Sequence, residues 1–287
     1  MRIYLLTIAI LLSLFSIDTN AQDELENPLM PYQETRPIFI GPVFGYNRSM
    51  HSVSLKTFAD EGNVNTDPCP TFDNGQSNGF YVGFTYEHIL GDYKNSNSSI
   101  IARVMYQTMP SYLEIGGDEY PSLVTIVDAD GNVVDEQIVN SSTLWTAEVD
   151  YSMITFEAVY KINPFEGNNL GFTIGPTFDY ALTKNLDQRM KLVTPRNAQF
   201  KRPEPGTGYD YLEYADNDRT IIFFNDEIPN SSAFRFGMKI GIQYEILMGR
   251  MYVVPGIQYN FGITNLTSEE SWRVSPIQAG FDIRFSI

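Results

Sequence analysis

The chain contains few of the residues from which catalytic and metal sites are usually built. Its 287 residues include one cysteine, Cys69, and two histidines, His51 and His88. A lone cysteine cannot close an internal disulfide, and so few ligands do not support a metal cluster. Basic residues are also scarce, with 19 Lys and Arg against 35 Asp and Glu and a net charge of −16. This balance argues against nucleic-acid binding, which needs a basic surface.

Long apolar runs are missing as well, except at the N-terminus. Ile3–Ile17 is almost wholly apolar, follows Arg2 and precedes the small residues of Thr19-Asn20-Ala21. We predict a secretory signal peptide over residues 1–21, with Gln22 as the first mature residue. The alternative, a membrane anchor, is disfavoured because a spanning helix needs about 20 apolar residues. No later run reaches eighteen apolar residues, so no transmembrane helix is expected.

The sequence is rich instead in apolar and polar residues that alternate with a period of two. Such alternation is typical of strands in a sheet with unlike faces. Eight segments show it: Ile38–Ser49, Gly79–Ile89, Ser99–Met109, Trp145–Ile162, Leu170–Thr183, Phe234–Ile246, Val253–Thr264 and Ile277–Ile287. Each is long enough to cross a bilayer as a tilted strand, which takes about 9 to 11 residues. We therefore predict an all-β fold, a closed antiparallel transmembrane β-barrel of eight strands.

The predicted connections between these segments alternate in length. Three are short: Leu90–Ser98, Asn163–Asn169 and Leu247–Arg250. The other four are Met50–Asn78, Tyr112–Leu144, Leu186–Ser231 and Thr267–Ser271, of which the first three are long. Bacterial outer-membrane barrels have short periplasmic turns and longer extracellular loops, so both termini are predicted to be periplasmic. The domains are thus the signal peptide, a short periplasmic lead-in over 22–37 and the barrel over 38–287, with no further domain expected after Ile287.

Three irregularities accompany this pattern. Asp128–Asn132 predicts a hairpin turn within the second long loop. Its flanks are too short for two more spanning strands, and a ten-strand barrel is the alternative. The alternation in Trp145–Ile162 slips near Met153-Ile154, which predicts a β-bulge there. Prolines also lie on the apolar face within three strands, where further bulges could accommodate them: Pro42, Pro176 and Pro255.

The acidic residues are concentrated in the loops. The stretch from Glu114 to Glu136 carries seven acids and no base. Such a surface fits a position beside lipopolysaccharide, where divalent cations bridge like charges, although ordinary solubility explains it equally well. Outer-membrane lipid and lipopolysaccharide are therefore expected partners, together with proteins at the extracellular loops.

The last segment resembles a known family. The stretch Trp272–Phe285, together with the pairs Gly41-Pro42 and Gly175-Pro176, is similar to the PorT-like outer-membrane β-barrel proteins of Bacteroidetes and Chlorobi. The aromatic Phe285 near the C-terminus looks like the signal by which the barrel assembly machinery selects its clients. The resemblance implies an outer-membrane location. It implies no particular activity, because most members of this group have no assigned activity.

Charges of both signs fall on the predicted inward face. Five acids and five bases make up this predicted lumen charge network: Glu87, Arg103, Glu157, Lys161, Asp179, Arg235, Lys239, Glu245, Asp282 and Arg284. An eight-strand barrel has an interior that side chains can fill, and buried charges need partners. We therefore expect a salt-bridged filling of the lumen; the alternative is a path for protons or ions.

Few residues point to other chemistry. His51, predicted in the first long loop beside Ser49 and Ser52, is the one arrangement that could serve a barrel enzyme. His88 is expected on the lipid side, in an aromatic girdle. Asp128-Ala129-Asp130-Gly131 is similar to a calcium loop, but its glycine comes one residue early, which favours a turn. No metal or other cofactor is expected.

Three functions remain in view. The leading hypothesis is a non-enzymatic barrel that acts as a surface scaffold or interaction protein with a filled lumen. The second is a narrow transport or secretion-associated component of the outer membrane. The third is a lipid-modifying or proteolytic barrel enzyme.

Overall fold

The computed structural model of the chain describes residues 38–55, 71–90, 96–165, 167–206, 212–249, 251–268 and 271–286. The predicted signal peptide, the lead-in and Cys69 lie outside these residues. The elements of the described part are all strands: β1 (Ile38–Leu55), β2 (Phe72–Ile89), β3 (Ser98–Thr108), β4 (Ser111–Val127), β5 (Val133–Ile162), β6 (Leu170–Thr194), β7 (Ala198–Phe200), β8 (Glu213–Ala215), β9 (Thr220–Glu227), β10 (Phe234–Tyr244), β11 (Ile246–Met248), β12 (Met251–Gly262), β13 (Arg273–Val274) and β14 (Ile277–Ser286). Among them there is no helix of the length and apolarity that crossing a membrane requires.

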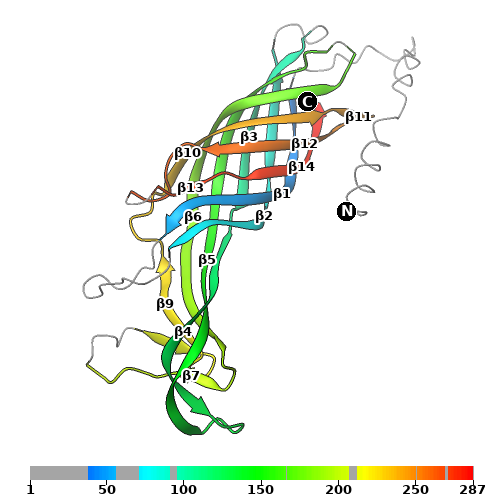
Figure 1. The fold of residues 1–287 in the computed structure, drawn as a ribbon. Coiled ribbons are helices and arrows are strands. Elements are labelled where there is room, and N and C mark those ends of the chain that lie inside the picture. Colours follow the sequence, from blue (N-terminus) through cyan, green and yellow to red (C-terminus); the bar gives the residue numbers. More distant parts are fainter. Residues whose placement is uncertain are drawn as a thin grey trace, which may run out of the picture. The chain divides into compact units, whose positions relative to one another are not determined.

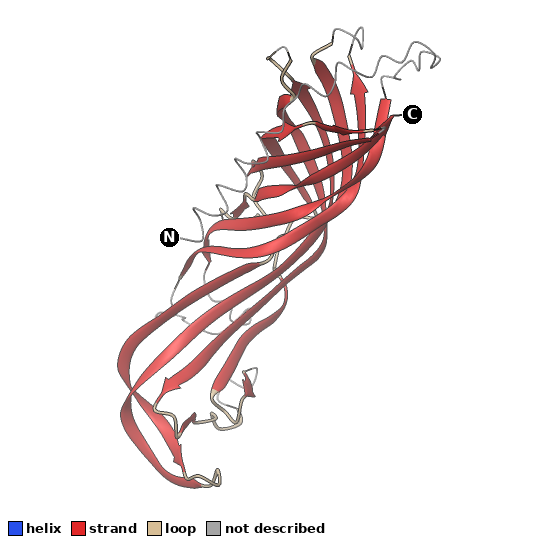
Figure 2. Cartoon of the chain, turned by 90° about the vertical axis from the view of Figure 1, so that its right-hand side faces the viewer, coloured by secondary structure: helices blue, strands red, loops and turns tan. Residues whose placement is uncertain are grey.

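Eight of these strands close a ring, whose course can be followed in Figures 1 and 2. Hydrogen-bonded neighbours follow the order β1, β2, β3, β5, β6, β10, β12 and β14, and β14 pairs back to β1. Phe39 faces Ser286 and Arg48 faces Ile277 where the first and last strands meet. The eight predicted segments are thus the eight strands of one closed antiparallel barrel, and the ten-strand alternative is wrong.

The barrel begins and ends beside its short turns. Ile38 pairs with His88, immediately before the turn that starts at Leu90, and Phe39 pairs with Ser286. The amide of Leu90 donates to the carbonyl of Ser98 across this turn at 3.0 Å. Both ends of the barrel segment therefore lie at the end that carries the short connections.

Beyond the opposite end, the strands continue as a folded β-structure, called here the extension (residues 111–150 and 184–227). β4 continues β3 after a break at Met109 and Pro110, and β9 leads into β10 after a break at 228–233. Within the extension β4 pairs with β5, β5 with β6, and β6 with β9. The connections Tyr112–Leu144 and Leu186–Ser231, predicted as loops, are therefore largely strand, because they prolong the ladders of the barrel.

The structure corrects the predicted phase slip in β5. Odd-numbered side chains are buried without interruption from Ala147 to Lys161, so the strand keeps its phase through Met153-Ile154. The extra residue at this level is Leu182 in β6, since Ser152 pairs with Thr183 and Met153 with Ala181. The bulge lies at the predicted level but in the neighbouring strand. What changes at Met153 is the chemistry of the interior, from apolar to polar.

The prolines in the strands need no bulges. Pro42 faces Phe84, Pro176 faces Met238 and Pro255 faces Phe281, and the register on either side of each pair is unchanged. The expectation of bulges at these three positions is wrong. Each proline has a paired residue on one neighbouring strand, whereas no pairing is present at its position on the other neighbouring strand.

Candidate functional site in the lumen and the extension

The outer wall of the ring carries a continuous apolar band. Its members are large side chains that stay exposed, among them Phe84, which is 74% exposed, and Ile240 and Ile257, each more than half exposed. On β1 the band runs from Ile38 to Tyr46 and ends at Arg48, whose guanidinium donates to the Asn78 side chain at 2.9 Å. An apolar outer wall around a polar interior is the arrangement of a transmembrane β-barrel, so the predicted fold class is confirmed.

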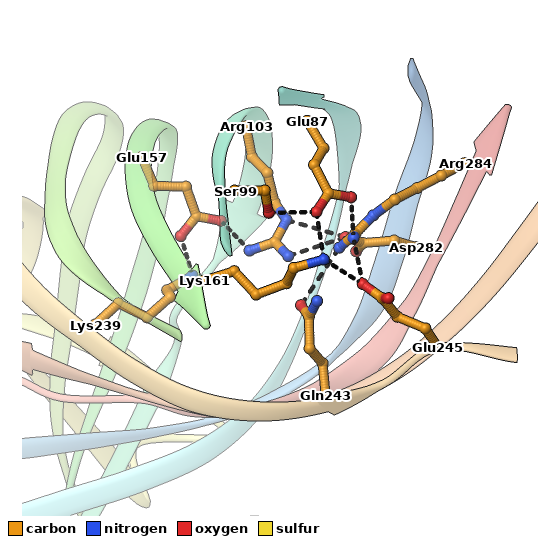
Figure 3. A network of polar contacts seen from close by, with 10 residues as sticks. All are labelled: Glu87, Ser99, Arg103, Glu157, Lys161, Lys239, Gln243, Glu245, Asp282 and Arg284. Carbon is orange, nitrogen blue, oxygen red and sulfur yellow. Dashed lines mark hydrogen bonds and ion pairs between the residues drawn. The ribbon is translucent and has the colours of Figure 1, made fainter. Parts of the chain in front are cut away.

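The structure places all ten predicted lumen charges inside the ring and joins eight of them in one network (Figure 3). Its central link is Arg103, which reaches Glu157 at 3.3 Å and Asp282 at 2.9 Å. Arg284 continues the chain, with 2.6 Å to Asp282 and 2.5 Å to Glu87. β5 and β14, which lie on opposite sides of the ring, are thereby tied together through β3, and β14 is also tied to β2.

The remaining members extend the network at both ends. Lys161 pairs with Glu87 at 2.5 Å and also with Glu245, while Lys239 pairs with Glu157. All but Glu245 are buried, and four acids balance four bases. Burying an ion costs several kcal/mol unless it is paired and hydrogen-bonded, so this balance is what a closed interior requires.

The other two predicted charges form a separate pair nearer the extension. Arg235 contacts Asp179 at 2.6 Å, and a further guanidinium nitrogen donates to the carbonyl of Val274 at 2.7 Å. Thr155 also donates to Asp179, at 2.5 Å. This pair lies against the sulfur atoms of Met109 and Met153, which mark the start of the apolar interior.

An apolar core fills the barrel mouth above that pair. Its buried members come from β1, β2, β4, β5, β6 and the segments before β10 and β14: Val53, Leu55, Phe72, Met109, Leu113, Ala147, Val149, Tyr151, Met153, Ala181, Leu186, Ile228, Leu266, Trp272 and Val274. Sequence reasoning missed this core. A signal for it is present in the sequence, because every odd position of β5 from Ala147 to Met153 is apolar. If the whole inner face is assumed to be polar, this run looks like a slip in the alternation.

His51 belongs to this core, not to a loop. It lies in β1, is 1% exposed, and has both ring nitrogens engaged. The indole N–H of Trp272 donates to Nδ1 at 3.1 Å, and Nε2 lies 3.0 Å from the carbonyl oxygen of Met109. Because an indole nitrogen only donates, Nδ1 accepts and Nε2 carries the proton, so the ring is neutral. The prediction that His51 lies in a loop is wrong, and Ser49 is engaged elsewhere, since its hydroxyl donates to the Pro110 carbonyl and lies 3.3 Å from the carbonyl oxygen of Ser77.

The calcium-like segment is a turn, as the spacing predicts. The Asp128 carboxylate accepts hydrogen bonds from the amides of Asp130 and Asn132, each at 2.9 Å. These bonds, those from Asn132 foremost, hold the pKa of Asp128 below its ordinary value. Within the described residues there is no group of three or more His, Cys, Asp or Glu side chains suited to a metal ion.

The far end of the extension has its own small core. Val124, Leu192 and Ala198 are fully buried, with Ile126, Val139 and Phe200 packed against them. β7 closes over this core by pairing with β4. The guanidinium of Arg219 donates to the backbone carbonyls of Leu192, Pro195, Arg196 and Ala198, which secures the turn between β6 and β7. The end of the extension is therefore a folded unit.

Comparisons with known proteins add only distant likenesses. No family model and no curated protein matches the chain. Among solved structures, it is similar to Neisserial surface protein A (9% identity, TM-score 0.35, covering 88% of this chain and 97% of that one). It is also similar to Ail, the attachment invasion locus protein of Yersinia pestis (11%, 0.32, 86% and 98%), and to the outer membrane protease OmpT of Escherichia coli (10%, 0.34, 88% and 98%).

Proposed function

We propose that this protein is a non-enzymatic β-barrel of the bacterial outer membrane that anchors the extension at the cell surface, where the extension contacts partner proteins. The observation that carries the proposal is the matched reversal of polarity along β5. From Ile154 to Ile162 its outer side chains are apolar and its inner ones mostly polar; from Trp145 to Ser152 the outer ones are polar and the inner ones apolar. One part of the strand thus suits lipid and the other suits water.

The height of the apolar band supports a membrane position. On β1 and β5 it covers nine residues, from Ile38 to Tyr46 and from Ile154 to Ile162. Nine residues of a tilted strand span roughly 23 Å, close to the band of about 25 Å in outer-membrane barrels. Bacterial outer-membrane barrels carry their short turns on the periplasmic side, which supports a periplasmic position for both ends of the barrel segment and an extension outside the cell. Outer-membrane lipid and lipopolysaccharide would surround the band.

The filled interior supports a scaffold rather than a channel. The ionic network blocks the lumen at the level of the band, and the apolar core blocks its mouth. The relation to PorT-like proteins, with Phe285 as a signal for the barrel assembly machinery, stays a prediction.

Two measurements on the intact protein test the proposal. The chain should fractionate with the outer membrane and migrate differently on a gel before and after heating, as closed barrels do. Purified protein in planar bilayers should give no stable, porin-like conductance. Recovery as a detergent-free periplasmic monomer would contradict the membrane anchor, and reproducible large single-channel steps would make the protein a pore.

Partner binding by the extension needs a separate test in intact cells. Neighbours crosslinked to the wild type should be compared with those of a variant in which residues 117–143 are replaced by Asn-Gly. This dipeptide suits a two-residue hairpin and would join Gly116 to Leu144, which are already paired. Loss of protein crosslinks from a variant that still inserts would support the proposal, and an unchanged set of neighbours would contradict it.

A further inference from the structure

The extension leaves one strand edge without a partner strand. β6 pairs with β5 only up to Ser142, which faces Thr194; the chain then turns away to form β7 on the far side of β4. From Val133 to Ser141, β5 is paired with β4 alone among the described strands. The other edge of this nine-residue segment, called here the open edge, therefore presents unpaired backbone groups.

The open edge differs from the other edge of the same hairpin, which belongs to β4 and pairs with β2 at Tyr112 and with β7 from Val124 to Ile126. β4 contains Gly116 and Pro121, and its ladder to β5 shifts register between Gly116 and Glu119. Glycine, proline and bulges are devices that keep an edge from pairing with other chains. Residues 133–141 contain neither glycine nor proline, and their one register shift against β4 lies at the end of the segment, where Val134 is skipped between Val133 and Asp135. From Asp135 to Ser141 the open edge thus keeps the form of a strand able to accept another.

Large aliphatic side chains stand out beside this edge. Ile138 is 73% exposed and Val133 and Val134 are each 65% exposed, more than the other exposed aliphatic residues of the extension, such as Val193 at 43%. Leu123, 48% exposed, faces Ile138 on the neighbouring strand. Grouped exposed aliphatic residues on a surface that faces water mark an interaction site.

The acidic residues of the open edge indicate what kind of segment it can bind. Asp135 and Glu136 lie in the open edge, within the stretch Glu114–Glu136 that holds seven acids and no base. Glu136 pairs with Lys201 at 2.8 Å, but both side chains are nearly half exposed, so this pair adds little. A second copy paired antiparallel here would bring four carboxylates together, which is destabilising. A strand with basic residues opposite Asp135 and Glu136 would gain cross-strand attraction instead.

We infer that the open edge takes up an extended segment of a partner protein, in which a pair of basic residues is flanked by aliphatic ones. The backbone of that segment would add a strand to β5, its aliphatic side chains would contact Val134 and Ile138, and its basic pair would face Asp135 and Glu136. The inference rests on the proposed function, since it names the chemistry of the partner that the extension would bind.

The test uses the full chain in detergent and a fluorescent, acetylated peptide, Thr-Val-Thr-Lys-Lys-Val-Thr, read by anisotropy. Antiparallel to β5, this peptide places its lysines opposite Asp135 and Glu136 and its valines opposite Val134 and Ile138. The control peptide has the same sequence with alternate backbone amides N-methylated, so it keeps the charge but cannot complete the ladder. We expect the first peptide to bind and the second to bind at least about tenfold more weakly. Equal binding, or no binding of the first, would overturn the inference.

Matched variants locate the site. Ile138→Lys should weaken binding of the first peptide about tenfold, whereas Thr125→Lys should change it less than about threefold. Both add one positive charge to the same face, but Thr125 lies in β4, which is paired there with β5 and β7. If both variants weakened peptide binding equally, the added charge alone would explain the effect, and strand addition at the open edge would be overturned. A dimer in analytical ultracentrifugation that Ile138→Lys abolishes would show that a second copy, not a basic segment, fills the edge.

The outcomes separate the two proposals. If the peptide does not bind while the crosslinks still depend on the extension, the inference about the open edge is wrong and the proposed scaffold function stands. If the peptide binds but the chain is absent from the outer membrane, the open edge stands and the proposed function is wrong.

Discussion

The barrel and the extension use the same strands with opposite chemistry. In the barrel part of β5, Glu157 and Lys161 face inward while Phe156 and Tyr160 face outward. In the extension part, Ala147 and Val149 face inward while Glu148 and Asp150 face outward. Backbone geometry is continuous across the change, since both parts alternate with a period of two. The comparison teaches that the solvent on the outside, lipid or water, decides which face of a strand is apolar.

Removal of one side chain should lower the folding stability by different amounts in different parts of the molecule. The largest loss is expected in the ionic interior of the barrel. Arg103→Met would leave Glu157 and Asp282 buried without their main partner, which should cost about 3–5 kcal/mol of folding free energy. Arg202→Met, which breaks an ion pair with the side chain 64% exposed, should cost less than about 1 kcal/mol. Urea titrations of heat-modifiable mobility would measure both. Similar costs would mean that the lumen is open to water.

The outer faces can be compared with a matched pair of charges. Ile257→Lys, in the middle of the apolar band, should cost about 2–4 kcal/mol, and Ile240→Arg should behave alike. Ile138→Lys, on the outer face of the extension, should be close to neutral because its side chain already meets water. Gln258→Lys, on the inner face of β12, should be better tolerated than its neighbour. Equal folding yields across these variants would mean that the inner and outer faces are wrongly assigned.

The junction between the regions can be probed at His51. His51→Leu would leave the indole N–H of Trp272 and the carbonyl of Met109 without their partner, at a cost of about 1–3 kcal/mol for a buried unsatisfied group. Ser52→Ala, at the exposed neighbouring position, should have no measurable effect. Fluorescence of the tryptophans during urea unfolding reports the change. Unaltered stability of His51→Leu would show that the ring is not held as described.

The smallest effect is expected at the turn of the extension. The pKa of Asp128 is lowered by hydrogen bonds from Asn132, so the turn gains stability that is present above the ordinary carboxyl pKa of about 4 and is lost as the pH falls through the lowered value. The protection factors of the Asp130 and Asn132 amides, which correct for the pH dependence of intrinsic exchange, should therefore fall on acidification while the barrel stays folded. Asp128→Ala should show the low protection factors already at neutral pH. Identical protection factors at both pH values would contradict the role given to the carboxylate.

The sequence by itself determined the eight barrel strands, their inner and outer faces and the ten inward charges. It could do so because lipid and a filled lumen impose opposite demands on successive residues, and a period of two makes these demands visible in Ile277–Ser286 or Phe234–Tyr244. It also indicated the turn at Asp128–Asn132, whose chemistry is local.

Only the tertiary structure decided which charges pair and what lies beyond the band. Arg103 and Asp282 are far apart in the chain and meet across the lumen, which no local pattern records. The burial of His51 depends on Trp272 and Met109 from other strands in the same way. The sequence did not predict the strands of the extension, because near the barrel their outer faces are polar and their inner faces apolar, the reverse of the pattern in the barrel. Its open edge exists because β6 leaves β5 at Thr194, a change of partner that depends on how the strands cross in space.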